Sequence, residues 1–214
     1  ETTILGTAIG FAHNGFIPIP EIQFLAYLHN AEDQLRGEAA TLSFFSNGQF
    51  SNPMVIRIPA LAYQKGFGGH FHNDNSIAVL RDIPGILIAC ASNGYDAALL
   101  LLRAVKLAYE IQRFFIFLYP IVLFMMRDLH QKQDQAWLSS YPDFSTELTE
   151  NDIHIHGTGE DIMLISYANG YYLARQAQKI LADEYNIHIS VMDIRWLKPL
   201  PITAITKAVQ HYNH

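Results

Sequence analysis

The sequence predicts an α/β protein: a doubly wound parallel sheet followed by the first part of a second α/β domain. Apolar, strand-like runs alternate with amphipathic stretches long enough for helices, the order that produces parallel sheets. The run 54–58 is apolar except for Arg57, which is typical of a sheet covered on both faces. We divide the 214 residues into a first domain at 1–126, a linker at 127–160 and part of a second domain at 161–214.

Three elements are expected before the first clear strand. Residues 6–14 predict a short helix, 16–19 a strand and 22–45 a long helix. Small residues on the first helix would let another backbone approach closely, at a cost of roughly 1 kcal/mol for each glycine; they are Gly6, Ala8, Gly10 and Ala12. The long helix carries apolar or small residues at helical spacing, namely Phe24, Leu28, Ala31, Leu35 and Ala39.

In the rest of the first domain, predicted strands and helices alternate. We expect strands at 54–58, 86–90 and 114–118, a loop at 59–75, and helices at 76–81 and 94–110. Ser92 and Asn93 could cap the last helix, and Asp96 lies in its first turn. Arg57 is buried in the strand pattern, so we expect a carboxylate partner from a neighbouring helix or loop.

After the polar linker at 127–160, which has little periodicity, strands and helices alternate again in the second domain. The pattern predicts a strand at 161–167, a helix at 169–184, a strand at 188–194 and a helix at 201–212. A unit of this size buries little surface by itself, so we interpret it as half a domain.

Composition excludes several classes of protein. The formal net charge of −6 argues against nucleic-acid binding. Cys90 is the one cysteine, which favours a reducing compartment. The longest apolar run, 114–126, contains Pro120 and is shorter than the roughly 20 residues of a membrane span. We therefore expect a cytoplasmic protein, or a mitochondrial matrix protein if the source is eukaryotic.

A glycine-rich loop at 66–76 holds the first candidate site residues, His70 and His72. Glycine lets a backbone approach a ligand closely, and a histidine with a pKa of about 6.5 can transfer protons near neutral pH. An ordinary loop is the alternative. Zinc is less favoured because two histidines without cysteine are too few ligands. We interpret His154 and His156, a second pair, as satisfied or exposed side chains.

The first thirty-four residues carry a longer pattern with fixed spacings: Glu1, Gly6, Gly10, Pro18-Ile19-Pro20-Glu21, Gln23-Phe24 and Ala31-Glu32-Asp33-Gln34. This pattern resembles the pyrimidine-binding domain of thiamin diphosphate enzymes, most closely the beta subunit of the 2-oxo acid dehydrogenase E1 component. A later set resembles the opening of the transketolase-type C-terminal domain: Asp193, Arg195, Pro199 and Leu200. Because Glu1 already lies inside the pattern, we expect the first domain to be incomplete at its N-terminus and the second to be incomplete as well.

The resemblance implies roles for particular residues. Glu1 would hydrogen-bond N1′ of the cofactor's aminopyrimidine and promote its imino form, which is acid–base catalysis relayed through a cofactor; a solvated terminal acid is the alternative. Tyr27 would pack against the pyrimidine ring, or serve as a core aromatic. His72, with His70 as a nearby alternative, would face the substrate or an intermediate. Glu21 would give structural support rather than catalysis.

The resemblance also implies partners. We find no Gly-Asp-Gly followed by Asn, the segment that holds Mg²⁺ and the diphosphate in this family, so that side would come from an alpha-type subunit or a fused domain. The implied reaction is oxidative decarboxylation of a 2-oxo acid, with acyl transfer to a lipoyl-bearing E2, by a homo- or hetero-oligomer. A transketolase-like ketol transferase is an alternative, slightly disfavoured because Lys65 is the only Lys or Arg in residues 59–76. A non-catalytic assembly subunit is a third.

Three positions depart from the family pattern, which usually has Pro, Glu and Asp where this chain has Ala91, Tyr119 and Pro201. They are structural or interface positions, so they weaken the expectation of an intact interface more than that of cofactor chemistry.

Overall fold

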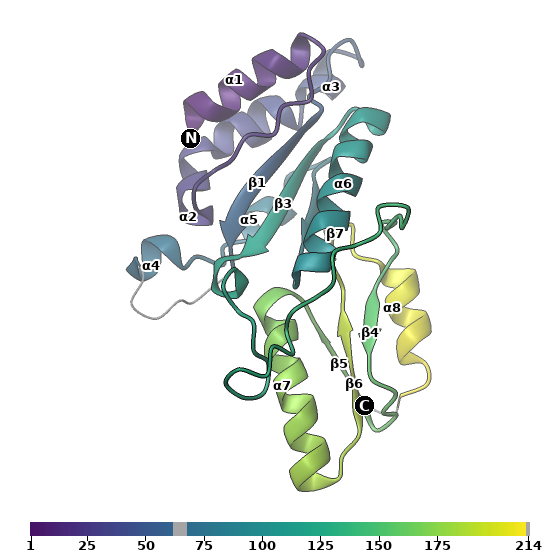
Figure 1. Ribbon diagram of the computed structural model, residues 1–214. Helices are drawn as coiled ribbons and strands as arrows, with labels where there is room; N and C mark the ends of the chain where they lie inside the picture. The colour runs from purple at the N-terminus through teal and green to yellow at the C-terminus, as the bar shows by residue number, and fades with distance from the viewer. Residues whose placement is uncertain (62–67, 213–214) are drawn as a thin grey trace.

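The computed structural model describes residues 1–61 and 68–212, which form two sheets arranged end to end (Figure 1). The first sheet has the order β1-β3-β2-β7. Its parallel strands are β1 (Met54–Ala60), β3 (Phe114–Pro120) and β2 (Leu87–Cys90), and β7 (Trp196–Lys198) runs antiparallel to β2. The predicted α/β class with a mainly parallel sheet is confirmed.

Apolar side chains cover both faces of the first sheet. Met54, Ile56 and Ile58 enter one buried cluster, whereas Val55 of the same strand enters another. Because side chains alternate along a strand, a continuous apolar run is required when helices lie on both sides, as the sequence predicted.

The segment 22–45 is not one long helix. It is divided into α2 (Leu25–Leu28), a 3₁₀ turn η1 (His29–Ala31), a π-helical stretch η2 (Gln34–Ala39) and α3 (Leu42–Phe45). Gly37 lies inside the π-helical stretch and weakens helix propensity by about 1 kcal/mol relative to alanine. The changes in helix type keep the predicted stripe buried, at Leu28, Ala31, Leu35 and Ala39.

The strand expected at 16–19 is an extended segment outside the assigned strands. The amides of Val55 and Arg57 donate to the carbonyls of Pro18 and Pro20, at 3.1 and 2.9 Å. Proline has no N–H to return these bonds, and the segment makes one isolated bridge, between Glu21 and Arg57.

The first helix, α1 (Thr2–His13), is longer than predicted and packs differently. Ala8 and Ala12 are buried. Gly6 and Gly10 are exposed, and a Cβ added to either would meet nothing within 4 Å. The expected close backbone contact at these glycines is therefore absent from the described part of this chain.

The predicted loop at 59–75 contains one helical turn, α4 (Gly69–His72), and α5 (Ala78–Arg81) follows it. On the opposite face of the sheet lies α6 (Gly94–Ile111). Asn93 is its cap and accepts a bond of 2.9 Å from the Asp96 amide, as predicted. Ser92 instead accepts a hydrogen bond from the amide of Ala168, the first residue of α7 (Ala168–Tyr185).

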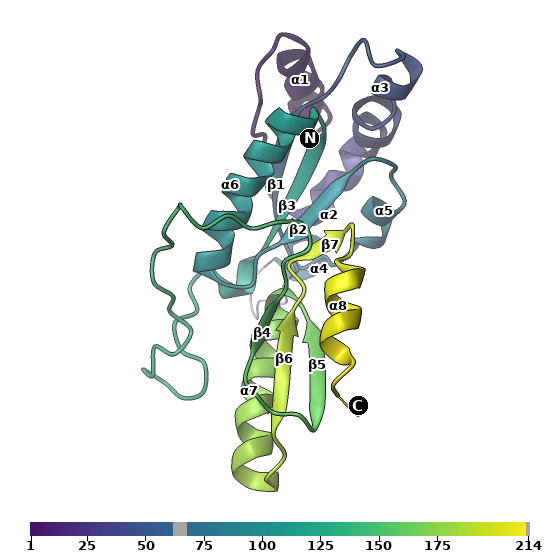
Figure 2. The same ribbon diagram turned by 90° about the vertical axis from the view of Figure 1, so that its right-hand side faces the viewer.

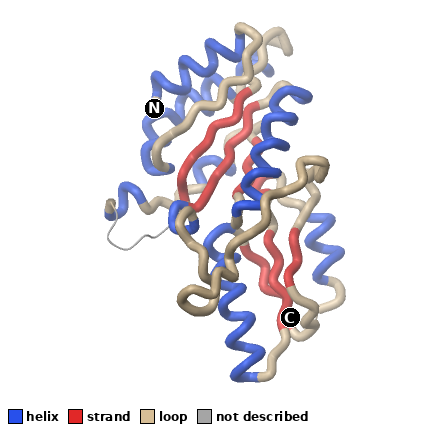
Figure 3. Tube along the Cα trace, viewed as in Figure 1, coloured by secondary structure: helices blue, strands red, loops and turns tan. Residues whose placement is uncertain are grey.

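The second sheet has the order β4-β6-β5 (Figure 2). It consists of β4 (His154–His156), β6 (Ile189–Asp193) and β5 (Ile162–Ser166), flanked by α7 (Ala168–Tyr185) and α8 (Ile202–Val209). Two strands were not expected. β4 lies inside the expected linker, which otherwise is mainly loop after the 3₁₀ turn η3 (Ile121–Leu123) (Figure 3), and β7 forms after a turn at Arg195, where φ is 56°.

In the described ranges 1–61 and 68–212, no helix is both long and apolar enough to cross a lipid bilayer.

Candidate functional site

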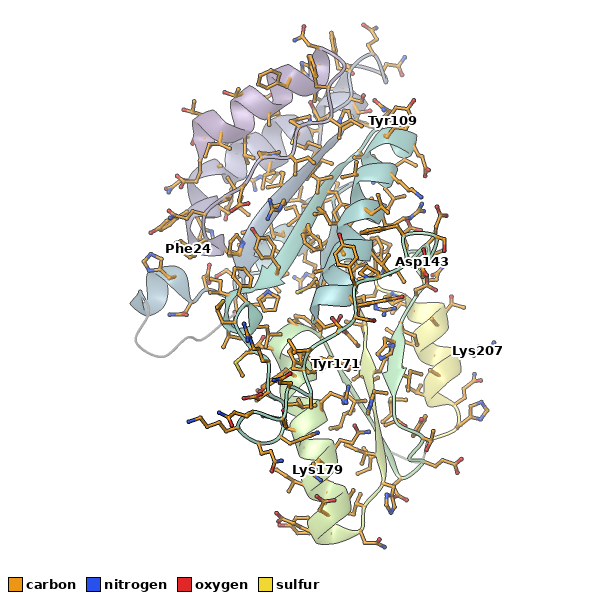
Figure 4. The ribbon with its side chains drawn as sticks, in the orientation of Figure 1. Phe24, Tyr109, Asp143, Tyr171, Lys179 and Lys207 are labelled. Atoms are coloured by element: carbon orange, nitrogen blue, oxygen red, sulfur yellow. The ribbon has the colours of Figure 1, made fainter. Side chains whose placement is uncertain are left out.

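Three aromatic rings meet beyond the carboxyl end of β1, where α2 faces α4. The ring centroids of Phe24 and His72 are 4.4 Å apart, and those of Tyr27 and His72 are 5.8 Å apart. Figure 4 labels Phe24 at this position. We call Phe24, Tyr27 and His72 the ring cluster. The structure thus brings together Tyr27 and His72, two residues that the sequence selected separately.

The hydrogen bonds of His72 define its tautomer. Its Nδ1 lies 2.8 Å from the Gly68 carbonyl oxygen, which can only accept, so Nδ1 donates. Its Nε2 lies 3.1 Å from the Tyr27 hydroxyl. In the neutral imidazole Nε2 then accepts a hydrogen bond from the Tyr27 hydroxyl.

A second histidine supports the loop that carries His72. His29 Nδ1 lies 2.5 Å from Glu32 and its Nε2 lies 3.3 Å from Asp74. The hydrogen bond to Glu32 and then the one to Asp74 raise the His29 pKa above its usual value. The sequence analysis missed this role, although an acid three residues after a helical histidine was an available signal.

Glu1 lies at the N-terminal end of α1, on the same side of the sheet as α2 (Figures 1 and 2). The Thr2 hydroxyl donates to the Asn30 carbonyl at 2.6 Å, which ties this end of α1 to the turn after Tyr27. Glu1 is partly buried, and its side chain forms no cap hydrogen bond to α1.

The predicted carboxylate partner of Arg57 is confirmed as Glu21, with Nη1 and Oε2 3.0 Å apart. The Arg57 side chain is 38% exposed, so it is less buried than its strand pattern predicted. Arg57 also lies over the ring of Tyr119, and burial raises the Tyr119 pKa to about 12. Arg57 and Tyr119 line a cavity of about 540 Å³ beside α6, away from the ring cluster.

The other candidate histidines, His70, His154 and His156, lie in different environments. His70 belongs to α4, but its side chain lies outside the described residues, as does Lys65. His156 bonds to Gln178 at 2.9 Å, whereas His154 lines a cavity between the two sheets. Among the residues that the structure describes, no group of three or more His, Cys, Asp or Glu side chains could hold a metal ion.

Comparisons with known proteins match both parts of the chain. Residues 1–120 match the family described as the transketolase pyrimidine-binding domain, and residues 151–214 match the transketolase C-terminal domain. The second match begins before β4, in agreement with the place of that strand in the second sheet.

Relatives that align over almost all of this chain are named as beta subunits. The 2-oxoisovalerate dehydrogenase subunit beta of Pseudomonas aeruginosa is 30% identical, and the pyruvate dehydrogenase E1 component subunit beta of Bacillus subtilis is 28% identical. Each alignment covers 98% of this chain and 59% of the relative, so the chain spans less than two thirds of these proteins.

A solved structure described as a split gene transketolase, inactive beta4 tetramer, shares the fold. The TM-score is 0.71 at 17% identity, and the alignment covers 99% of this chain and 59% of the other. Because the family model covers more than half of the chain, the chain belongs to the family of the transketolase pyrimidine-binding domain.

Proposed function

We propose that this chain is the beta-type portion of a thiamin diphosphate-dependent 2-oxo acid dehydrogenase E1. The observation that carries the proposal is the Tyr27–His72 hydrogen bond at 3.1 Å, on the side of the sheet where Glu1 begins α1. The names of the relatives support the reaction class, because they act on pyruvate and 2-oxoisovalerate by name. We leave the identity of the 2-oxo acid open.

The residues present fit the aminopyrimidine half of thiamin diphosphate. A flat heterocycle needs an aromatic surface and a carboxylate at its ring nitrogen. Tyr27 and Phe24 supply the aromatic surface, and Glu1 supplies a partly buried carboxylate that forms no cap bond to its helix. When bound, the cofactor supplies a nucleophilic carbon and accepts the electrons released by decarboxylation.

Each residue then has a separate task. Glu1 shares a proton with the pyrimidine ring nitrogen, and a dry environment suits this role because it raises a carboxyl pKa. Tyr27 packs against the ring and holds Nε2 of His72. His72 would meet the substrate through Nε2, so substrate binding would displace the Tyr27 hydroxyl from this nitrogen; an imidazole placed there can transfer a proton to a substrate oxygen or bind a carboxylate.

We further propose that activity requires a partner. In the described part of the chain the acidic side chains do not fit Mg²⁺, so we assign the metal and the diphosphate to an alpha-type subunit or a fused domain. The exposed Gly6 and Gly10 on α1 offer a surface where a partner backbone can approach closely. The acyl group would then pass to a lipoyl-bearing E2, in the cytoplasm or the mitochondrial matrix.

The test is a Glu1→Gln variant assembled with its alpha-type partner. We expect 2-oxo acid decarboxylation to fall by about 10²–10⁴-fold, the usual contribution of an acid–base group. Glu38→Gln, which changes an exposed acid in η2, is the control and should keep its turnover.

Calorimetric titration of both variants with thiamin diphosphate and Mg²⁺ separates binding from chemistry. Binding without turnover in Glu1→Gln supports the catalytic role. Unchanged turnover in Glu1→Gln would remove it and leave a non-catalytic assembly subunit as the better account.

A further inference from the structure

A cavity of about 240 Å³ lies where the two sheets meet. Its wall comes from the first turn of α6, residues 136–139, β4, α7 and the turn at Arg195. Tyr171, labelled in Figure 4, lies at the end of α7 that faces the first sheet. The ring cluster does not line this cavity, so a ligand here would be separate from the cofactor of the proposed function.

Positive charge exceeds negative charge in the cavity wall. Arg195 forms a two-pronged ion pair with Asp96, at 2.6 and 3.1 Å, and both side chains are buried. Arg175 is different, since it forms no ion pair with any described residue and its Nη1 donates to the Tyr171 hydroxyl at 3.3 Å. The guanidinium charge of Arg175 is therefore not compensated within the part of the chain described.

Arg175 also has an unused donor. Its Nε is buried and has no hydrogen-bond partner among the described residues. A buried donor without a partner costs about 1–3 kcal/mol. An anion in the cavity would not reach the buried Nε but would compensate the charge through the terminal guanidinium nitrogens, because guanidinium groups bind oxyanions through charge-assisted N–H bonds.

His154 lies at the mouth of the same cavity. Its ring keeps some exposed surface, but the protein atoms packed around it and then the Arg195 guanidinium lower its pKa. Arg175 and His156 act in the same direction, and the Asp96 carboxylate opposes them. Tyr171 and Asp193 also face His154: the ring centroids of His154 and Tyr171 are 6.3 Å apart, and Asp193 is the partner of His154 across β6. Burial raises the pKa of the Asp193 carboxyl to about 7, so its negative charge is only partly present near neutral pH.

We propose that this cavity binds a small organic oxyanion, a carboxylate or a phosphate ester. Its charged group would lie against Arg175 and His154, and its apolar body against Trp137 and Tyr171, whose ring centroids are 5.9 Å apart. A volume of about 240 Å³ suits a small metabolite.

Binding of such an anion is coupled to a proton. A bound oxyanion favours the charged imidazolium of His154 over the neutral ring and so raises the His154 pKa. The affinity for the anion must then increase as pH falls, and binding near neutral pH must take up a proton. A site filled only by water would show neither effect.

The experiment is a calorimetric titration of the whole protein with inorganic phosphate and, separately, with benzoate, near pH 6 and again near pH 7.5. We expect saturable binding of the probe. Benzoate keeps the same charge at both pH values, so it should bind more tightly at the lower pH, and the NMR signal of His154 should titrate at higher pH when benzoate is present. Arg175→Gln should weaken binding by about tenfold or more, the loss of one charge-assisted hydrogen bond. Lys179→Gln, one turn further along α7 and paired with Asp183, should leave binding unchanged.

The two probes distinguish the sources of the charged group: tighter benzoate binding indicates a carboxylate, and tighter phosphate binding indicates a phosphate ester. If Arg175→Gln does not fold, as judged by circular dichroism, Arg175→Lys replaces it and should bind more weakly because the planar fork is lost. The proposal is overturned if neither probe binds saturably, or if the affinity is the same in the Arg175 variant and in the original protein.

Discussion

The buried ion pair between Asp96 and Arg195 connects the two halves of the fold, so its removal gives the largest predicted loss of stability. Asp96 begins α6 beside the first sheet, and Arg195 follows the last strand of the second sheet. Their side chains are 2% and 8% exposed. Arg195→Met should therefore lower the free energy of unfolding by about 3–5 kcal/mol, the cost of leaving one charge of a buried pair without its partner.

Because of Asp193, we expect the loss of stability to differ between Arg195→Met and the other single variant, Asp96→Asn. Its carboxyl is buried and one oxygen accepts the Arg195 amide; burial, with a contribution from the Asp96 charge, raises its pKa to about 7. In Asp96→Asn the Arg195 charge keeps Asp193 as a counter-ion, so this variant should lose less stability than Arg195→Met. The double variant, Asp96→Asn with Arg195→Met, should be more stable than Arg195→Met alone, since it leaves no isolated charge at this position.

Urea unfolding monitored by tryptophan fluorescence and circular dichroism is the assay. Trp137 lies beside α7 and Trp196 lies in the core of the first sheet, so the two residues report on both halves. Lys179→Met removes an exposed pair on α7 and should cost less than about 1 kcal/mol. A loss below about 1 kcal/mol in Arg195→Met would refute the reasoning, because it would mean that water reaches the pair.

Three further predictions follow from other contacts. His29→Ala should increase amide hydrogen exchange in residues 68–76 at low pH, where protonated His29 holds Asp74, and the difference should disappear as pH rises through the raised His29 pKa. Gly159→Ala should destabilise the protein by about 1–3 kcal/mol in thermal unfolding, because the new Cβ would lie 2.3 Å from backbone atoms just before β6. Gly10→Ala, where the added Cβ meets open space, should instead stabilise the isolated chain by up to about 1 kcal/mol.

The sequence predicted those strands and helix ends that are determined by neighbouring residues in the chain. The three parallel strands of the first sheet appear where continuous apolar runs placed them, and the Asn93 cap and the Glu21 partner of Arg57 agree with expectation. β7 was not predicted, because it is three residues long and forms only where Arg195 turns the chain onto β2. A local pattern contains no information about such a distant partner.

In the candidate site, too, local features were predicted and contacts between distant residues were not. Tyr27 and His72 were selected from motifs, but their hydrogen bond joins residues 45 positions apart and could not be read from either motif. The His29–Asp74 contact was missed for the same reason. The broken helix at 22–45 was missed because the apolar spacing alone does not distinguish α, 3₁₀ and π turns that bury the same residues.

The place of β7 has a consequence for synthesis on the ribosome. Trp196, the first residue of β7, follows the end of β3 at Pro120 by 76 residues. At about 5–20 residues per second, the nascent chain needs roughly 4–15 s to deliver the strand that closes β2. During that interval the backbone groups along one side of β2 lack their native partner, and open strand edges pair readily with other chains. We therefore expect the chain to be most prone to aggregation, and to benefit most from a chaperone, while β2 waits for β7.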